Sequence, residues 1–214
     1  VCMQFLDTQF FLGMIIYAPA ILLALSFHEL SHALVARRLG DTTAEEAGRI
    51  TLNPLAHLDP VGTIMIFLFH FGWAKPVPVN PHNFRHPEKD MMLVSLAGPA
   101  SNFALAVVFG MAAWGMGKFF GSTVGTVVYK MVLAVITINA ILMVFNLIPI
   151  PPLDGSKILF GLIGASREFQ IRYSQVGPIL LLGLIVLGRL TGFSVFSMIL
   201  SPVVNLFYRI FVYV

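Results

Sequence analysis

The sequence predicts an all-helical, polytopic membrane protein that forms a single integral-membrane domain over residues 1–214. Two observations support this fold class. Of the 214 residues, 57% are hydrophobic and 11% are charged, whereas an average soluble domain has about 25% charged residues. The mean hydropathy is +0.87, and several apolar stretches reach the ~20 residues that a helix needs to cross a bilayer. A chain with so few charges cannot form a solvated surface on all sides.

About five stretches are expected to be transmembrane helices. The first runs over residues 10–27 and continues through a polar pentapeptide to residue 36, with Pro19 as an expected kink. It lacks the basic start and the small-residue cleavage site of a signal peptide. The other four expected spans cover residues 91–116, 124–147, 176–190 and 193–214.

The composition changes between the first and second spans, where six prolines interrupt residues 39–90. Residues 61–71 are the one apolar run there. This run is too short for a comfortable crossing and predicts a re-entrant or interfacial segment. Residues 73–79, WAKPVPV, are expected to be extended, because each proline disfavours helical geometry in the residue before it.

The distribution of Lys and Arg predicts the orientation. Basic residues gather at the end of the first span, before the second span, and between the third and fourth spans. By the positive-inside rule these segments are expected to be cytoplasmic. With five spans, the N-terminus would then lie outside and the C-terminus inside.

The first span contains the polar pentapeptide HELSH, residues 28–32. His28 and His32 are four residues apart and share one helix face, so both imidazoles can bind one metal ion, while Glu29 lies about 100° further round. This is the HExxH pattern of zinc peptidases. A charged group in an apolar helix costs about 3 kcal/mol or more in the membrane, so a compensating cation is expected. The alternative is that these side chains only bind neighbouring helices.

Asp154 is the best candidate for a third ligand, since catalytic zinc takes three protein ligands and keeps one position open. It lies in NLIPIPPLDG, residues 146–155, whose prolines forbid a continued helix and force an extended backbone. The alternative is a turn aspartate that caps a helix beginning near Gly155. The sequence therefore predicts one Zn²⁺ per chain, bound by His28, His32 and Asp154.

HELSH and NLIPIPPLDG together resemble the site-2 protease family of intramembrane zinc metalloproteases. The resemblance includes GRITLNPLAHLDPVGTIM at 48–65, GWAKPVPVNP at 72–81 and SLAGPASN at 95–102. It implies that His28, His32 and Asp154 bind zinc and that Glu29 activates water. The compact form of the family is expected, because no segment fits a PDZ-like or CBS-like domain.

Three asparagines are candidates for further polar roles. Asn146 is our candidate catalytic amide, which would bind the developing oxyanion or the substrate backbone; the alternative is an interhelical hydrogen bond. Asn102 has the same two possible roles, and Asn139 is expected to be structural. The extended residues 73–79 could pair with an unwound substrate, or could form a plain interfacial turn.

The expected function is an intramembrane zinc endopeptidase that cleaves transmembrane segments of other proteins. The partners would be a transmembrane protein substrate and the lipid bilayer; nothing in the composition indicates nucleic acid binding. The location would be a prokaryotic cell membrane, with the active site toward the cytoplasm. One alternative is a metal-ion or proton transporter that uses the same buried His and carboxylates, although no inverted repeat is evident. Another is an inactive binding protein, which the four filled catalytic positions disfavour.

Overall fold

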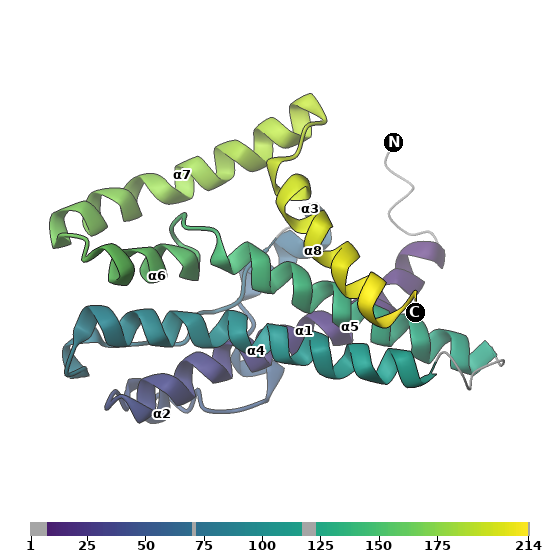
Figure 1. The fold of residues 1–214 in the computed structure, drawn as a ribbon, viewed down its shortest axis with the longest axis horizontal. Helices are drawn as coiled ribbons and strands as arrows, with labels where there is room; N and C mark the ends of the chain where they lie inside the picture. The colour runs from purple at the N-terminus through teal and green to yellow at the C-terminus, as the bar shows by residue number, and fades with distance from the viewer. Residues whose placement is uncertain (1–7, 70–71, 117–122, 214) are drawn as a thin grey trace.

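The computed structural model describes residues 8–69, 72–116 and 123–213, and this part of the chain is helical (Figure 1). Its pairing of extended backbone is limited to an isolated antiparallel bridge between Leu58 and Ala74. The elements are α1 (Thr8–Arg38), α2 (Thr43–Glu46), η2 (Pro54–Ala56), α3 (Pro60–Phe69), η3 (Pro81–Asn83), α4 (Pro87–Met116), α5 (Thr123–Leu147), α6 (Asp154–Ile163), α7 (Arg167–Thr191) and α8 (Val195–Phe211).

Four helices in the described residues are long and apolar enough to cross a membrane. They are Ile15–Arg38 within α1, Pro87–Met116, Gly125–Leu147 within α5, and Arg167–Thr191. The prediction of an all-α, polytopic membrane protein is confirmed. α7 begins at Arg167 rather than at residue 176, because Ser166 caps it by accepting a hydrogen bond from the Phe169 N–H. The fifth expected span contains α8, which has 17 residues and is a shorter apolar helix.

The described residues between α1 and α4, 39–69 and 72–86, form no helix long enough to cross a membrane. α3 has 10 residues, a length of about 15 Å, which is half of the ~30 Å hydrocarbon thickness. Residues 72–80 form no helix, as the prolines predict; Ala74 forms the bridge with Leu58, and the Lys75 N–H donates to the His57 carbonyl at 2.8 Å. His57 is itself buried, and its Nε2 hydrogen-bonds the Thr51 carbonyl at 2.9 Å.

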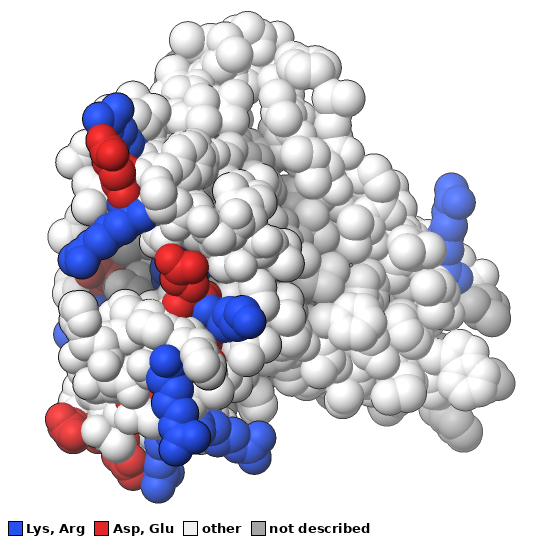
Figure 2. Space-filling model, turned by 60° about the vertical axis from the view of Figure 1, so that its left-hand side comes forward, with Lys and Arg blue, Asp and Glu red and all other residues white. Residues whose placement is uncertain are grey.

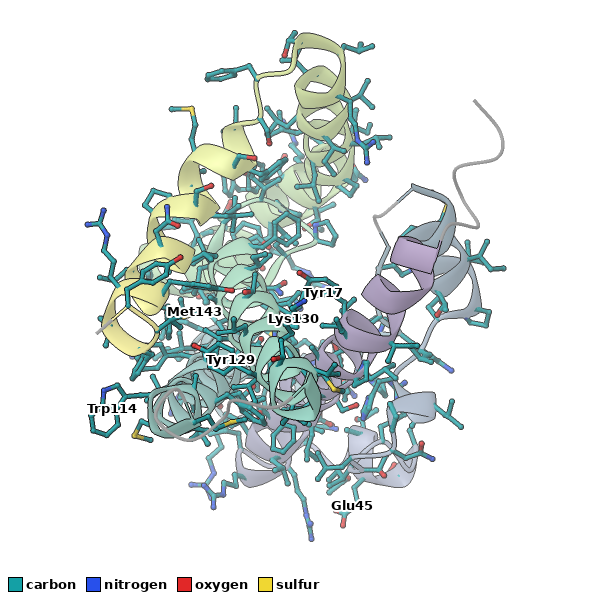
Figure 3. All side chains as sticks on the ribbon, turned by 90° about the vertical axis from the view of Figure 1, so that its right-hand side faces the viewer. Tyr17, Glu45, Trp114, Tyr129, Lys130 and Met143 are labelled. Atoms are coloured by element: carbon teal, nitrogen blue, oxygen red, sulfur yellow. The ribbon has the colours of Figure 1, made fainter. Side chains whose placement is uncertain are left out.

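α4 is the central helix and packs against α1, α5, α6 and α8. Small side chains lie at these contacts: Ala20 and Ala24 of α1, Ala106 and Ala113 of α4, and Ala134 and Ala140 of α5 are all buried. Small residues let helix backbones approach closely, which favours association in lipid, where apolar burial between helices gives little advantage. Many larger apolar side chains are exposed instead, among them Trp114 at the edge of the bundle in Figure 3.

α8 runs back along α4 and α5 from Phe196, which contacts Phe145, to its last turn, where Phe207 packs against Ala106 and Ile136. The described part of α1 begins, and α8 ends, at the same end of the molecule (Figure 1). The described helices therefore do not form the five alternating spans that were expected, which would put the end of α8 opposite the beginning of α1. The physical reason is that α7 is largely exposed and leans away from the bundle, so that α8 follows α4 in direction instead of completing a fifth alternating span.

Charged side chains gather at the end of the molecule that carries α2 and the beginnings of α6 and α7 (Figure 2). Asp41 organises part of this end. It is fully buried, and its carboxylate accepts hydrogen bonds from Thr43, from the Asn80 N–H at 2.8 Å and from Asn83 Nδ2 at 2.7 Å. Burial by itself would raise the pKa of Asp41, but these hydrogen bonds outweigh burial and hold the pKa below its ordinary value.

Candidate metal centre

Three side chains that the sequence singled out as metal ligands meet inside the bundle. His28 and His32 project from α1, and Asp154 begins α6; all three are buried. Asp154 Oδ2 lies 3.1 Å from His28 Nε2 and 3.2 Å from His32 Nε2, and the two Nε2 atoms are 3.0 Å apart. Residues 126 positions apart in the chain are thus brought into contact, and the group could hold a metal ion.

The backbone before Asp154 explains how the carboxylate reaches α1. α5 ends at Leu147, and the prolines that follow prevent another helical turn before Leu153, which is extended. Gly155 then packs against the end of α5 so closely that a Cβ there would overlap the Leu147 carbonyl and lie 2.5 Å from the Ile148 carbonyl oxygen. A residue without a side chain is needed at this position to seat the start of α6.

The outer nitrogens of both imidazoles have acceptors. His28 Nδ1 lies 2.7 Å from Asn102 Oδ1, and His32 Nδ1 lies 2.7 Å from the Val94 carbonyl. A carbonyl can only accept, so His32 Nδ1 carries the hydrogen. Asn102 also presents oxygen to His28, because its Nδ2 donates to the Ala24 carbonyl and to Asn139. In the neutral imidazoles, both Nε2 atoms therefore present lone pairs toward Asp154.

Converging lone pairs and a carboxylate need a cation between them, and their spacing fits zinc. Zinc binds nitrogen and oxygen ligands at about 2.0–2.1 Å in tetrahedral geometry, which places ligand atoms about 3.3 Å apart. The observed separations of 3.0 to 3.2 Å are close to this value. Two His and one carboxylate also leave one tetrahedral position for water or substrate. The donor set therefore fits a catalytic zinc.

Gly98 of α4 faces this group directly. A Cβ at Gly98 would lie 2.5 Å from His28 Cε1 and 2.5 Å from His32 Nε2. The small residue thus allows α4 to pass the two imidazoles, as expected from a glycine at a close helix approach. Asn102, one turn further along α4, is then positioned to hold His28.

Glu29 is buried, and its Oε2 accepts a hydrogen bond from the Val77 N–H at 2.8 Å. Val77 lies in the extended segment, and Pro76 and Pro78 on either side of it have no N–H to donate. The extended segment thus lies against the expected general base. The prolines of residues 73–79 predicted an extended conformation, but no sequence pattern predicted the contact between Val77 and Glu29.

The three asparagines have different surroundings. Asn146 is half-buried, and its Nδ2 donates at 3.1 Å to the Leu142 carbonyl in its own helix, so the described contacts do not join it to the three clustered ligands. Asn139 is fully buried; its Nδ2 donates to the Val135 carbonyl and its Oδ1 accepts from Asn102. Asn102 makes an interhelical hydrogen bond to His28, one of the expected metal ligands.

Comparison with known proteins gives three informative relatives and a family. A model described as peptidase family M50 matches residues 109–187. YwhC of Bacillus subtilis is 43% identical over 148 residues, which cover 67% of either chain. Rip2 of Mycolicibacterium smegmatis is 34% identical over 63% of this chain and 52% of its own length. MJ0611 of Methanocaldococcus jannaschii is 33% identical over 62% of this chain and 63% of its own length. All three carry the name "putative zinc metalloprotease". No solved structure matches the chain.

Proposed function

This chain belongs to peptidase family M50, the site-2 protease family of zinc metalloproteases, and from that premise we propose that it is an endopeptidase that cleaves transmembrane segments of other membrane proteins. One observation carries the proposal. The two imidazoles lie on α1, a helix long and apolar enough to span a membrane, and the buried carboxylate of Asp154 meets them from the short helix α6, which packs against α4 and α5; Glu29 is on the same helix as both histidines. A peptide bond cleaved here must be delivered within the bilayer or near its surface.

Each site residue has a proposed task. His28, His32 and Asp154 hold the ion, and Asn102 and the Val94 carbonyl fix the ring orientations of the histidines. When bound, zinc supplies a Lewis acid that activates water and polarises the scissile carbonyl. Glu29 accepts the proton of the attacking water and returns it to the leaving amine. The Val77 N–H holds one carboxylate oxygen of Glu29, which orients the other.

The active site is proposed to open toward the cytoplasm. The basic residues gather at the end of the molecule where α1 finishes, and Lys and Arg concentrate on the cytoplasmic side of membrane proteins (Figure 2). His32 lies five residues before Arg37, a rise of about 7.5 Å along α1. Water therefore has a short distance to travel from that surface to the ion.

The test compares Glu29→Gln with Glu45→Gln, an exposed glutamate on α2 that pairs with Arg37 at 3.0 Å. Purified proteins would be analysed for zinc and incubated with single-span membrane protein substrates. Glu29→Gln should retain one zinc per chain and lose at least about 100-fold in cleavage rate, because a positioned base contributes 10²–10⁴-fold. Glu45→Gln should cleave like the parent chain.

Two results would contradict the proposal. Zinc loss in a folded Glu29→Gln protein would make Glu29 a ligand rather than the base. Metal flux through proteoliposomes without peptide cleavage by the parent chain would indicate a transporter instead.

A further inference from the structure

A cavity of about 750 Å³ opens at the charged end of the molecule, between the beginning of α4, the middle of α6 and the first turns of α7. Its apolar lining includes Met91, Phe160 and Ile171, and its charged lining includes Glu88, Lys157 and Arg167. This volume is in the range of pockets that enclose small ligands or a few residues of a peptide. His28, His32 and Asp154 do not line this cavity.

The cavity begins about one helical turn from that group along α6 and about two turns from it along α4. On α6, Asp154 and Lys157 are three residues apart, a rise of about 4.5 Å. On α4, Met91 precedes Gly98 by seven residues, a rise of about 10 Å on the same helix face. Both helices therefore place the cavity on the charged side of the metal centre.

Lys157 contacts both the cavity and the metal centre. It lines the cavity, and its Nζ lies 3.8 Å from Asp154 Oδ1, the carboxylate oxygen that does not face the imidazoles. Arg167 lines the same side of the cavity and takes part in no ion pair with the described residues; the neighbouring Glu168 pairs with Arg172. Glu88 lies on the opposite, α4 side. The α6 and α7 side of the cavity is therefore basic.

We infer that this cavity receives the cytoplasmic flank of the protein substrate and that Lys157 and Arg167 bind an acidic side chain there, an inference that rests on the proposed function. A polypeptide cleaved at the metal centre must continue in both directions, and an extended chain advances about 3.3 Å per residue. The cavity is thus reached within a few residues of the scissile bond. The apolar lining of the cavity would contact substrate side chains that lie between the scissile bond and the acidic side chain.

The experiment measures binding separately from cleavage. Two short fluorescent peptides, one with two aspartates and one with two lysines in the same apolar context, would be titrated into the full chain carrying Glu29→Gln in neutral detergent. The aspartate peptide should bind more tightly by about fivefold or more, since each partly exposed ion pair contributes modestly. In Lys157→Glu, Arg167→Glu protein this preference should reverse.

Arg172→Glu is the matched control, since Arg172 is on α7 and does not line the cavity. It should keep the aspartate preference. Lys157→Gln, Arg167→Gln protein offers a gentler change if the double charge reversal does not fold, and it should bind both peptides equally. Zinc content and thermal unfolding report folding in every variant.

Equal binding of both peptides by the parent chain, or an equal loss in the Arg172→Glu control, would overturn the inference. So would displacement of the aspartate peptide by phosphatidylglycerol micelles together with tight binding of that lipid, which would make the cavity a lipid site. Failure of the proposed function looks different, because the parent chain would then cleave no substrate while still discriminating between the peptides.

Discussion

Replacing Asn102 by alanine isolates the hydrogen bond that orients His28. Asn102 is fully buried and connects three helices, since its Oδ1 accepts from His28 on α1 and its Nδ2 donates to Ala24 on α1 and to Asn139 on α5. Alanine would leave His28 Nδ1 without its acceptor, and the ring would be free to rotate or to change tautomer. Either change removes the Nε2 lone pair from the metal centre.

We expect Asn102→Ala to cause a large loss of zinc affinity and a modest loss in the free energy of unfolding. Removing the outer hydrogen-bond partner of a metal-binding histidine costs about 10–100-fold in metal affinity, which corresponds to about 1.4–2.7 kcal/mol. Three groups, His28 Nδ1, the Ala24 carbonyl and Asn139 Oδ1, would also lose a partner. Interhelical hydrogen bonds in membrane proteins average about 0.6 kcal/mol, so the helices should still assemble.

The assay is competition for zinc between the purified protein and a chelator of known affinity, with thermal unfolding as the measure of folding. Asn139→Ala is the control, because it also removes one side of the Asn102 to Asn139 hydrogen bond but leaves the one to His28. It should bind zinc within about threefold of the parent chain, and Asn102→Asp, which keeps an acceptor, should recover most of the affinity. Equal zinc affinities for Asn102→Ala and the parent chain would refute the positioning role.

Three further outcomes are expected. Asp154→Asn should weaken zinc binding by more than about tenfold, because an amide is a poorer ligand than a carboxylate, and unchanged metal content would remove Asp154 from the ligand set. Gly98→Ala should also reduce zinc affinity by about 10-fold or more, since its Cβ would lie 2.5 Å from both imidazoles, whereas Gly115→Ala in the same helix has nothing within 4 Å and should not. Because hydrogen bonds lower the folded-state pKa of Asp41, its contribution to stability is present above the unfolded value of about 3.9 and is lost as pH falls through the folded pKa. Unfolding followed from pH 7 to pH 2 should show this loss, and Asp41→Asn should flatten it.

Much of the fold and of the candidate site was predictable because the membrane imposes simple rules. Apolar runs near 20 residues predict spans, and α1, α4 and α5 confirm three of them nearly at the expected positions. A histidine pair four residues apart predicts one shared helix face. The prolines before Asp154 predict an interruption of helix, and the structure has it there.

The remaining features depend on contacts between distant segments. The Val94 carbonyl that holds His32 and the Val77 N–H that holds Glu29 are backbone groups, so residue type gives no signal for them. The direction of α8 was predicted wrongly, because alternation of spans was assumed and the tilt of α7 depends on side-chain packing. Asn102 was left between two roles, since a polar residue in a span indicates an interaction without indicating its partner.

The sequence by itself determined that lipid surrounds this protein, because composition decides whether lipid can cover the surface. It also predicted a metal-binding helix, because the two histidines and the glutamate of residues 28–32 become neighbours as soon as that helix forms. The sequence predicted Asp154 as the third ligand, but only the tertiary structure decided how its carboxylate reaches contact distance, which groups hold the imidazoles, and where the cavity at the charged end lies. Those features join α1, α4 and α6, whose relative positions are set by close packing at small residues such as Gly98 and Gly155.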